Sequence, residues 1–198
     1  MRTDSRSGGF SALELLFVVA LIGVIGAIAV PQLTHSLSYF RISGDARSIS
    51  NAVALTKMRA ASNFSRTRLH VDRAGRSFQI ERGDNATPTQ WTVEGGQTSL
   101  SQFSTYGFAP VATAPPNTQA VINQSAACLD NAGNAIANSS CILFNSRGVP
   151  IDNVGAPLPS NALYITNGQA VYAVTVSATG MIRMWQSGAS ATPNWVLQ

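Results

Sequence analysis

The chain has 198 residues, which allows one domain of ordinary size plus a helical anchor and excludes a large multidomain protein. Apolar residues make up 45% of the chain and charged residues only 11%, a globular composition in which Ser, Thr, Asn and Gln replace charges, as suits an exported protein. The net charge of +4 is uneven, because the segment from Arg41 to Arg82 is strongly basic and the chain beyond it is not.

An apolar run from Phe10 to Leu33 is long enough to cross a membrane, because a bilayer core about 30 Å thick needs roughly 20 apolar residues at 1.5 Å each. Two arginines and one aspartate precede the run. This excess of arginine predicts a cytoplasmic N-terminus and an exported remainder.

Glu14 is the one charged residue between Leu13 and Val30. A charge inside an apolar span costs about 2.5–3.5 kcal/mol or more, so such residues usually have a partner. Because Glu14 lies near the cytoplasmic end of the run, the alternative is a side chain that reaches back to the lipid headgroups.

Hydropathy alone fits a plain signal anchor, but the order of residues indicates more. The sequence Gly8-Gly9-Phe10, followed by Glu14 and then Pro31, resembles the class III signal of type IV prepilins and pseudopilins. The resemblance implies that a membrane peptidase cuts after Gly9 and that the new N-terminal residue, Phe10, is N-methylated. It also implies that Glu14 pairs with the Phe10 amine of a neighbouring pilin and sets the register of assembly.

The helical pattern resumes beyond Pro31, which would break or kink an isolated helix. Its apolar face recurs at three-, four- or seven-residue steps, in Ile42, Ala46, Ile49, Val53 and Ala60. We expect one helix from about Ser11 to Ala61, some 75 Å long. Its first half would lie in lipid or a filament core, and its second half on a globular domain.

After Asn63 the period of the pattern shortens toward two, which predicts strands. The expected strands are Thr67–Asp72 and Ser77–Glu81 as a hairpin, then Gln90–Glu94, Ala120–Ile122, Cys141–Phe144, Ala162–Thr166, Ala170–Val176 and Met181–Trp185. The predicted class is α+β, with a long N-terminal helix packed on an antiparallel sheet. The predicted segments are a leader (1–9), the transmembrane and assembly half of the helix (10–33), its amphipathic half (34–62) and a periplasmic β-rich head (63–198).

Cys128 and Cys141 enclose a loop of small and polar residues. Outside the cytoplasm we expect them to form a disulfide, which would stabilise the head by roughly 3 kcal/mol. A zinc site would need more ligands than these two cysteines offer nearby.

Several segments resemble minor pilins and pseudopilins of the GspH/FimT type: Lys57–Ala60, the hairpin Arg68–Ile80, Ile142–Gly148, and Val171–Ser177 with Gly180–Arg183. The resemblance implies an inner-membrane subunit that helps to initiate a type IV pilus, or one at the tip of a type II secretion pseudopilus. Its implied partners are other minor pilins, the major pilin, the prepilin peptidase with its methylase, and the inner-membrane assembly platform. A major pilin is the remaining structural alternative.

Neither His35 nor His70 has neighbours in the sequence that complete a catalytic or metal site, so we expect no enzyme activity and no cofactor. DNA binding is the second functional alternative. Family members that bind DNA carry Gly-Arg-x-Arg near the C-terminus, whereas this chain has Gly180-Met181-Ile182-Arg183. Arg183 and Arg147 are therefore candidate phosphate contacts, or else solvated residues of a turn and a strand edge. The Arg-rich region from Arg41 to Arg82 would supply further phosphate contacts, or else contacts with acidic headgroups or neighbouring subunits.

Overall fold

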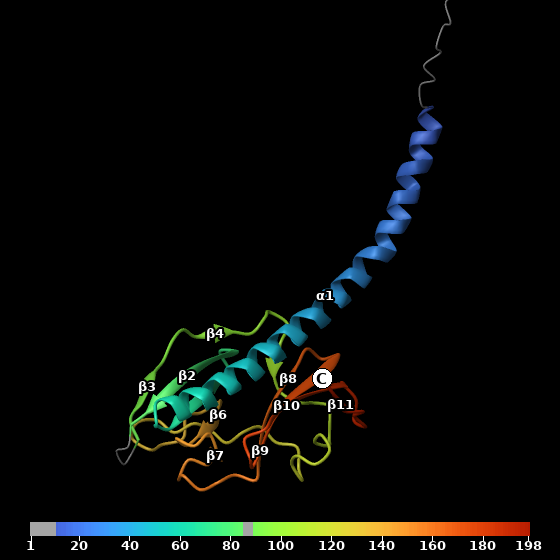
Figure 1. Ribbon diagram of the computed structural model, residues 1–198. Coiled ribbons are helices and arrows are strands. Elements are labelled where there is room, and N and C mark those ends of the chain that lie inside the picture. Colours follow the sequence, from blue (N-terminus) through green and yellow to red (C-terminus); the bar gives the residue numbers. More distant parts are fainter. Residues whose placement is uncertain (1–10, 85–88) are drawn as a thin grey trace, which may run out of the picture. The chain divides into compact units, whose positions relative to one another are not determined.

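The computed structural model describes residues 11–84 and 89–198 of the chain. The predicted leader, residues 1–9, and the predicted mature N-terminus, Phe10, lie outside the described residues. The chain divides into two compact units, Met1–Ser38 and Tyr39–Gln198, and we call the second unit the head. One helix, α1 (Ala12–Ser62), provides the helical part of the first unit and the first element of the head (Figure 1).

The helix α1 is continuous through Pro31, as the return of the helical pattern beyond that residue predicts. A proline inside a helix removes one backbone donor, and here that loss does not end the helix. At the C-terminal end, the Ser65 N–H donates to the Ala60 carbonyl at 3.3 Å, around Phe64 in a left-handed conformation with φ of 49°. This six-to-one bond closes the last turn, which is where a helix commonly stops.

The strands of the head form two sheets, and every pairing is antiparallel. The first has the order β3-β2-β1-β6-β7, with β4 also paired to β2. Its strands are β1 (Thr67–Asp72), β2 (Ser77–Gly83), β3 (Trp91–Val93), β4 (Thr98–Ser99), β6 (Ser139–Phe144) and β7 (Pro150–Ile151). The second has the order β11-β10-β9-β8-β5. Its strands are β5 (Thr105–Tyr106), β8 (Ser160–Thr166), β9 (Ala170–Ser177), β10 (Ile182–Gly188) and β11 (Val196–Leu197).

The α+β class is confirmed, but the strands form two adjoining sheets where one was expected. The strand predicted at Ala120–Ile122 is wrong, because this segment is irregular. The side-chain amide of Gln124 accepts the Tyr164 N–H at 3.0 Å and donates to the Tyr164 carbonyl at 2.8 Å. A side chain therefore satisfies the β8 backbone where another strand could have paired.

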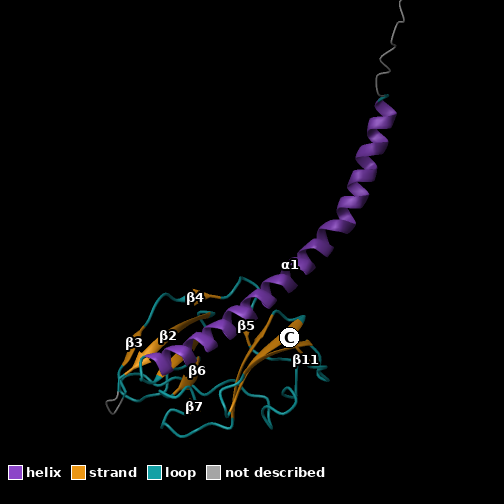
Figure 2. Cartoon of the chain, in the orientation of Figure 1, coloured by secondary structure: helices purple, strands orange, loops and turns teal. Residues whose placement is uncertain are grey.

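The main core of the head lies between α1 and both sheets. The predicted apolar face of the helix is buried completely or almost completely, in Ile42, Ala46, Ile49, Val53 and Ala60. The loops between the short strands (Figure 2) cover the other faces of the sheets. A loop containing Val111 and Ile122 packs on the five-stranded sheet, and the segment between Cys128 and Cys141 packs on the six-stranded sheet.

Candidate functional site

The first candidate site is the apolar N-terminal part of α1. Residues Ala12–Ala29 have a mean hydropathy of 2.6, and none of them is buried within the chain. Within the described residues, α1 is the one helix long and apolar enough to cross a membrane. Large apolar side chains project on all sides, and Leu13 and Leu16 are 80% and 71% exposed. A surface helix of a soluble domain would instead have one polar face, so this segment lacks the pattern of a helix that faces water.

Glu14 lies in the first turn of this segment and is exposed. Its backbone N–H donates to the Ser11 hydroxyl at 3.2 Å, which makes Ser11 the N-cap and places Glu14 at the third helical position. A carboxylate at that position lies near the positive end of the helix dipole. No hydrogen bond or ion pair to the Glu14 carboxylate occurs within residues 11–84 and 89–198, so the structure leaves it available to a partner.

The cap is a feature that the sequence-based argument missed, although Ser11-x-x-Glu14 is the usual capping-box pattern. The bond uses the backbone N–H of Glu14, so it does not engage the carboxylate that the intersubunit role requires. The two predicted processing residues, Gly9 and Phe10, lie outside the described residues.

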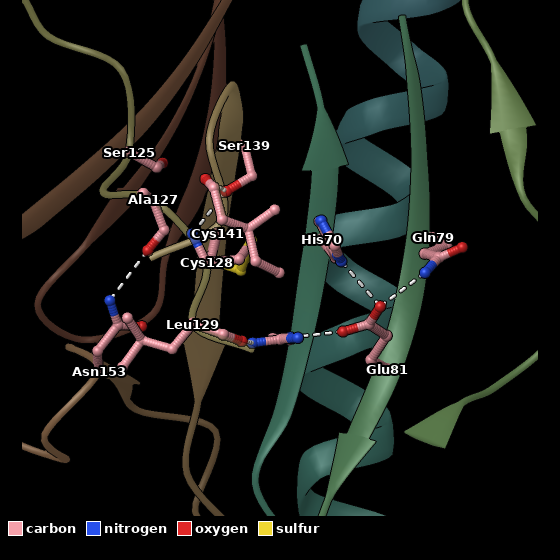
Figure 3. Close-up of a disulfide and its surroundings, with 12 residues drawn as sticks. His70, Gln79, Glu81, Ser125, Ala127, Cys128, Leu129, Ser139, Cys141 and Asn153 are labelled. Atoms are coloured by element: carbon pink, nitrogen blue, oxygen red, sulfur yellow. Dashed lines mark hydrogen bonds and ion pairs between the residues drawn. A yellow bond between two sulfur atoms is a disulfide. The ribbon is translucent and has the colours of Figure 1, made fainter. Parts of the chain in front are cut away.

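The second candidate region is the outer face of the six-stranded sheet, where the predicted disulfide is present. Cys128 and Cys141 are bonded, with their Cα atoms 5.0 Å apart. The Cys128 N–H donates to the Ser139 hydroxyl at 2.9 Å, and Asn153 donates to the Ala127 carbonyl at 3.0 Å (Figure 3). The loop is therefore fixed both covalently and by hydrogen bonds.

A largely buried polar cluster lies beside this loop, on neighbouring strands β1 and β2. Arg68 Nε donates to Glu81 Oε2 at 2.6 Å, and His70 Nδ1 donates to Glu81 Oε1 at 2.8 Å. Gln79 also donates to Oε1, at 2.6 Å, so three side chains converge on one carboxylate (Figure 3). The hairpin register places Arg68 directly opposite Glu81.

The buried charges of the cluster stabilise one another and so offset the cost of burial. Burial alone would raise the pKa of Glu81, but the His70 hydrogen bond, the Arg68 charge and the Gln79 hydrogen bond lower that pKa to about 2. Burial also lowers the pKa of Arg68, against the opposing effect of Glu81. The Arg68 guanidinium lies 4.0 Å from the centre of the Trp91 ring and donates to the Leu129 carbonyl at 2.6 Å. Through these contacts Arg68 links β1 to the disulfide loop and to Trp91 of β3.

A cavity of about 280 Å³ lies beside His70. Ser77 and Ser139 line it, but the Ser77 hydroxyl accepts from Gln97 and the Ser139 hydroxyl donates to the Ile136 carbonyl. Neither hydroxyl is bonded to the imidazole that would have to activate it. In the part of the chain that the structure describes, no three His, Cys, Asp or Glu side chains are placed to hold a metal ion.

The predicted DNA contacts lie near two touching turns. Gly148 and Gly180 have φ values of 71° and 74°, and a Cβ on Gly180 would lie 2.7 Å from the Gly148 carbonyl oxygen. Lys57 of α1 packs on both glycines and donates to the Gly180 carbonyl at 2.9 Å. Gly180 is therefore required for both conformation and space, and Gly148 for conformation. Arg147 is exposed on the first of them.

Arg183 is exposed on β10, opposite Thr175 of β9, and lines a cleft of about 240 Å³. Met181, in the position of the first family arginine, lines the same cleft. Arg183 is the one cation among the described residues that line it; the others include Asn117, Thr118, Ser160 and Ser177. The adjoining turns bring the segments that carry Arg147 and Arg183 close together, and Lys57 lies against both turns.

No family model matches the sequence, and no curated protein matches it. Among solved structures, two of the minor pseudopilin EpsH from the type II secretion system of Vibrio cholerae are similar to this chain. One is 12% identical, covers 80% of this chain and 96% of its own, and has a TM-score of 0.35. The other, a crystal structure, is 14% identical, covers 73% and 91%, and has a TM-score of 0.41. TM-scores this low do not assign the chain to a family.

Proposed function

We propose that the chain is a minor pilin or pseudopilin, a subunit that α1 anchors in the membrane and then joins to similar subunits. The observation that carries the proposal is the segment Ala12–Ala29, which is long enough to cross a bilayer and has no residue buried within the chain. A helix that is apolar on all sides is stable in lipid or among other apolar helices. Gly8-Gly9-Phe10 stands directly before it in the sequence.

In this proposal a prepilin peptidase removes residues 1–9 and Phe10 becomes the methylated N-terminus. The Glu14 carboxylate, which has no partner within the described residues, then pairs with the charged Phe10 amine of a neighbouring subunit. Such a pair offsets the cost of a charge among apolar helices. Register between subunits follows, because only one axial offset brings the amine to the carboxylate.

The head belongs on the periplasmic side in this proposal. Arginines before the apolar run favour a cytoplasmic N-terminus, and the Cys128–Cys141 disulfide suits an oxidising compartment. Its partners would be other pilins and the inner-membrane assembly platform. No catalytic step is assigned to the head, because the His70–Glu81 pair has no activated nucleophile within the described residues.

DNA binding is not part of the proposal. Phosphate binding gains strength from several cations acting together. The cleft at Arg183 provides one cation among its described residues, and Met181 occupies the place where the family motif has another.

Co-expression of the full chain with a prepilin peptidase tests the processing step. Intact-mass analysis should show loss of residues 1–9 and methylation of Phe10, and Gly9→Ala should block both. Ser7→Ala, a similarly small change within the leader, is the matched control and should be cut normally. Normal cleavage of Gly9→Ala would refute the leader assignment.

Mass spectrometry of sheared filaments from the native cell separates the two assemblies. A low-stoichiometry peptide beginning at methylated Phe10 in the filaments indicates a minor pilin, and a dominant one indicates a major pilin. The same peptide confined to the envelope fraction indicates a secretion pseudopilin. A peptide that retains residues 1–9 contradicts all three assignments.

A further inference from the structure

A set of aromatic and basic residues stands on the first residues of the head, on the loop whose Phe103 ring Arg41 contacts, and on the turn that is bonded to that loop. We call it the proximal patch and define it as Phe40, Arg41, Arg73, Arg76 and Phe103. We propose that the proximal patch rests on anionic phospholipid headgroups while the subunit is anchored in the membrane. The inference deepens the proposed function and rests on it, because it requires α1 to cross the bilayer.

Two phenylalanines of the patch are largely exposed, although the Phe40 ring has an edge contact with Tyr39. Phe40 is 70% exposed and Phe103 is 54% exposed. The Arg41 guanidinium lies 5.8 Å from the centre of the Phe103 ring, so a cation and an exposed ring stand together. Aromatic rings beside arginine are suited to the boundary between headgroups and acyl chains.

The loop that carries Phe103 is fixed to the head. The Asp45 carboxylate of α1 accepts both the Ser101 hydroxyl and the Ser101 N–H. Arg76 donates to the Gln102 carbonyl at 2.6 Å. Figure 1 shows the chain between β4 and β5 passing beside α1. The exposed ring is therefore presented by a well-anchored loop, and little conformational freedom would be lost when it contacts a surface.

The charges of this end of the head are arranged to favour an anionic surface. Arg41 and Arg73 are exposed. The two nearby carboxylates, Asp45 and Asp72, are half-buried and accept hydrogen bonds from Ser101 and from the Gly75 N–H. The positive groups face solvent and the negative groups are held within the head. An arginine close to an anionic membrane surface strengthens binding by roughly fivefold.

The patch follows the apolar window closely in the sequence. The window ends at Ala29 and the head begins at Tyr39, ten positions later in the chain. Even a fully extended chain of ten residues spans no more than about 35 Å, so the start of the head stays near the membrane that the window would cross. Phe40 and Arg41 are the second and third residues of the head.

The test uses the full chain in vesicles and a tryptophan placed at position 103. Phe103→Trp should be quenched by brominated lipids more strongly in vesicles containing phosphatidylglycerol than in neutral ones, after subtraction of the parent signal. Salt should reduce the difference. Val154→Trp is the matched control, because Val154 is 83% exposed on a turn beside Arg66, which follows the far end of α1.

Charge is tested with Arg41→Gln/Arg73→Gln in the Phe103→Trp background. These changes leave the Arg76 anchor of the loop intact, and the docking equilibrium should fall by roughly tenfold or more. Arg147→Gln/Arg183→Gln removes two exposed charges elsewhere and should have no effect.

Flotation of the vesicles distinguishes failure of the membrane anchor from failure of the proximal patch. A chain that does not float with the vesicles overturns the membrane anchor and the patch together. A chain that floats, but whose Phe103→Trp signal is quenched no more than that of Val154→Trp, overturns the patch alone.

Discussion

The two parts of α1 have opposite relations to the remainder of the chain. Between Ala12 and Ala29 no residue is buried, whereas between Ile42 and Ala60 every fourth or third residue is buried in the head core. The second part is explained by contacts that the chain itself supplies. The first part has apolar surface on all sides that no other described residue buries, so in the proposed function lipid or other subunits would cover it. One helix therefore has two environments, the core of the head for its second part and a surrounding apolar phase for its first part.

The largest effect should come from placing the same charge in each part. Val53 is 0% exposed and Val24 is 61% exposed. Val53→Asp buries an unpaired carboxylate and should destabilise the head by more than about 4 kcal/mol, enough to prevent folding. Val24→Asp should leave denaturant unfolding of the head, followed by near-UV circular dichroism in detergent, within about 0.5 kcal/mol of the parent.

For membrane insertion, Val24→Asp should be the harmful change. Val24→Asp should weaken insertion by about 2.5–3.5 kcal/mol, measured as the alkali-resistant fraction in membranes. If Val24→Asp also unfolded the head, the two parts of α1 would be energetically coupled and the comparison would fail.

The second effect concerns the stability of the head at low pH. Glu81 has a pKa of about 2 in the folded head against an ordinary value of 4.5. The unfolded chain therefore takes up this proton first as pH falls, so the stabilisation is complete above pH 4.5 and is lost between pH 4.5 and about 2. It amounts to about 3 kcal/mol.

Unfolding measured from pH 7 to pH 2 should show this loss, and Glu81→Gln should remove most of it. Glu94→Gln is a matched control, because Glu94 pairs with Arg59 and Arg82 at the surface, where such pairs contribute about 1 kcal/mol or less. An unchanged pH profile in Glu81→Gln would contradict the role of the buried cluster.

The third effect is the disulfide. Cys128→Ser/Cys141→Ser removes a link between residues 13 positions apart and should lower the free energy of unfolding by about 3 kcal/mol. Reduction of the parent should lower it by a similar amount. Insertion of α1 should not change, because the loop packs on the six-stranded sheet of the head. A variant as stable as the oxidised parent would show that hydrogen bonds alone hold the loop.

Much of this arrangement could be predicted from local patterns. The burial of Ile49 and Val53 follows from helical periodicity, and the hairpin of β1 and β2 from a short turn between alternating segments. With that hairpin in register, Arg68 and Glu81 were already opposite one another. Their pairing was therefore within reach of the sequence.

The division into two sheets could not be predicted from the sequence. Strands β4, β5, β7 and β11 have two residues each, too few to show any period. The Arg68 contact with Trp91 depends on where β3 pairs in the sheet. The Gln124 side chain makes the backbone hydrogen bonds that a neighbouring strand would otherwise make. Long-range packing decides these features. At the other end of the molecule, Gly9 and Phe10 lie outside the described residues, so their roles remain proposals.

The smallest effect on the head, and the sharpest test of the first part of α1, should come from Glu14. Removing this exposed side chain should leave unfolding of the head unchanged within about 0.5 kcal/mol. The charge and the polarity of the side chain are separable, because a glutamine keeps the size and hydrogen-bonding capacity of the glutamate but carries no charge. The cap bond comes from the Glu14 backbone N–H, so every variant at this position retains it. Glu14→Gln therefore removes only the charge that would pair with the Phe10 amine.

If charge sets the register, Glu14→Gln and Glu14→Ala should both be cleaved by the peptidase and both be depleted from filaments by about tenfold or more, which corresponds to 1.4 kcal/mol per subunit contact. If only a polar side chain is needed at this position, Glu14→Gln should enter filaments like the parent and Glu14→Ala should not. Quantifying the matured peptide in filament and envelope fractions distinguishes these outcomes. Normal entry of both variants would mean that the one charge in the apolar segment has no part in assembly.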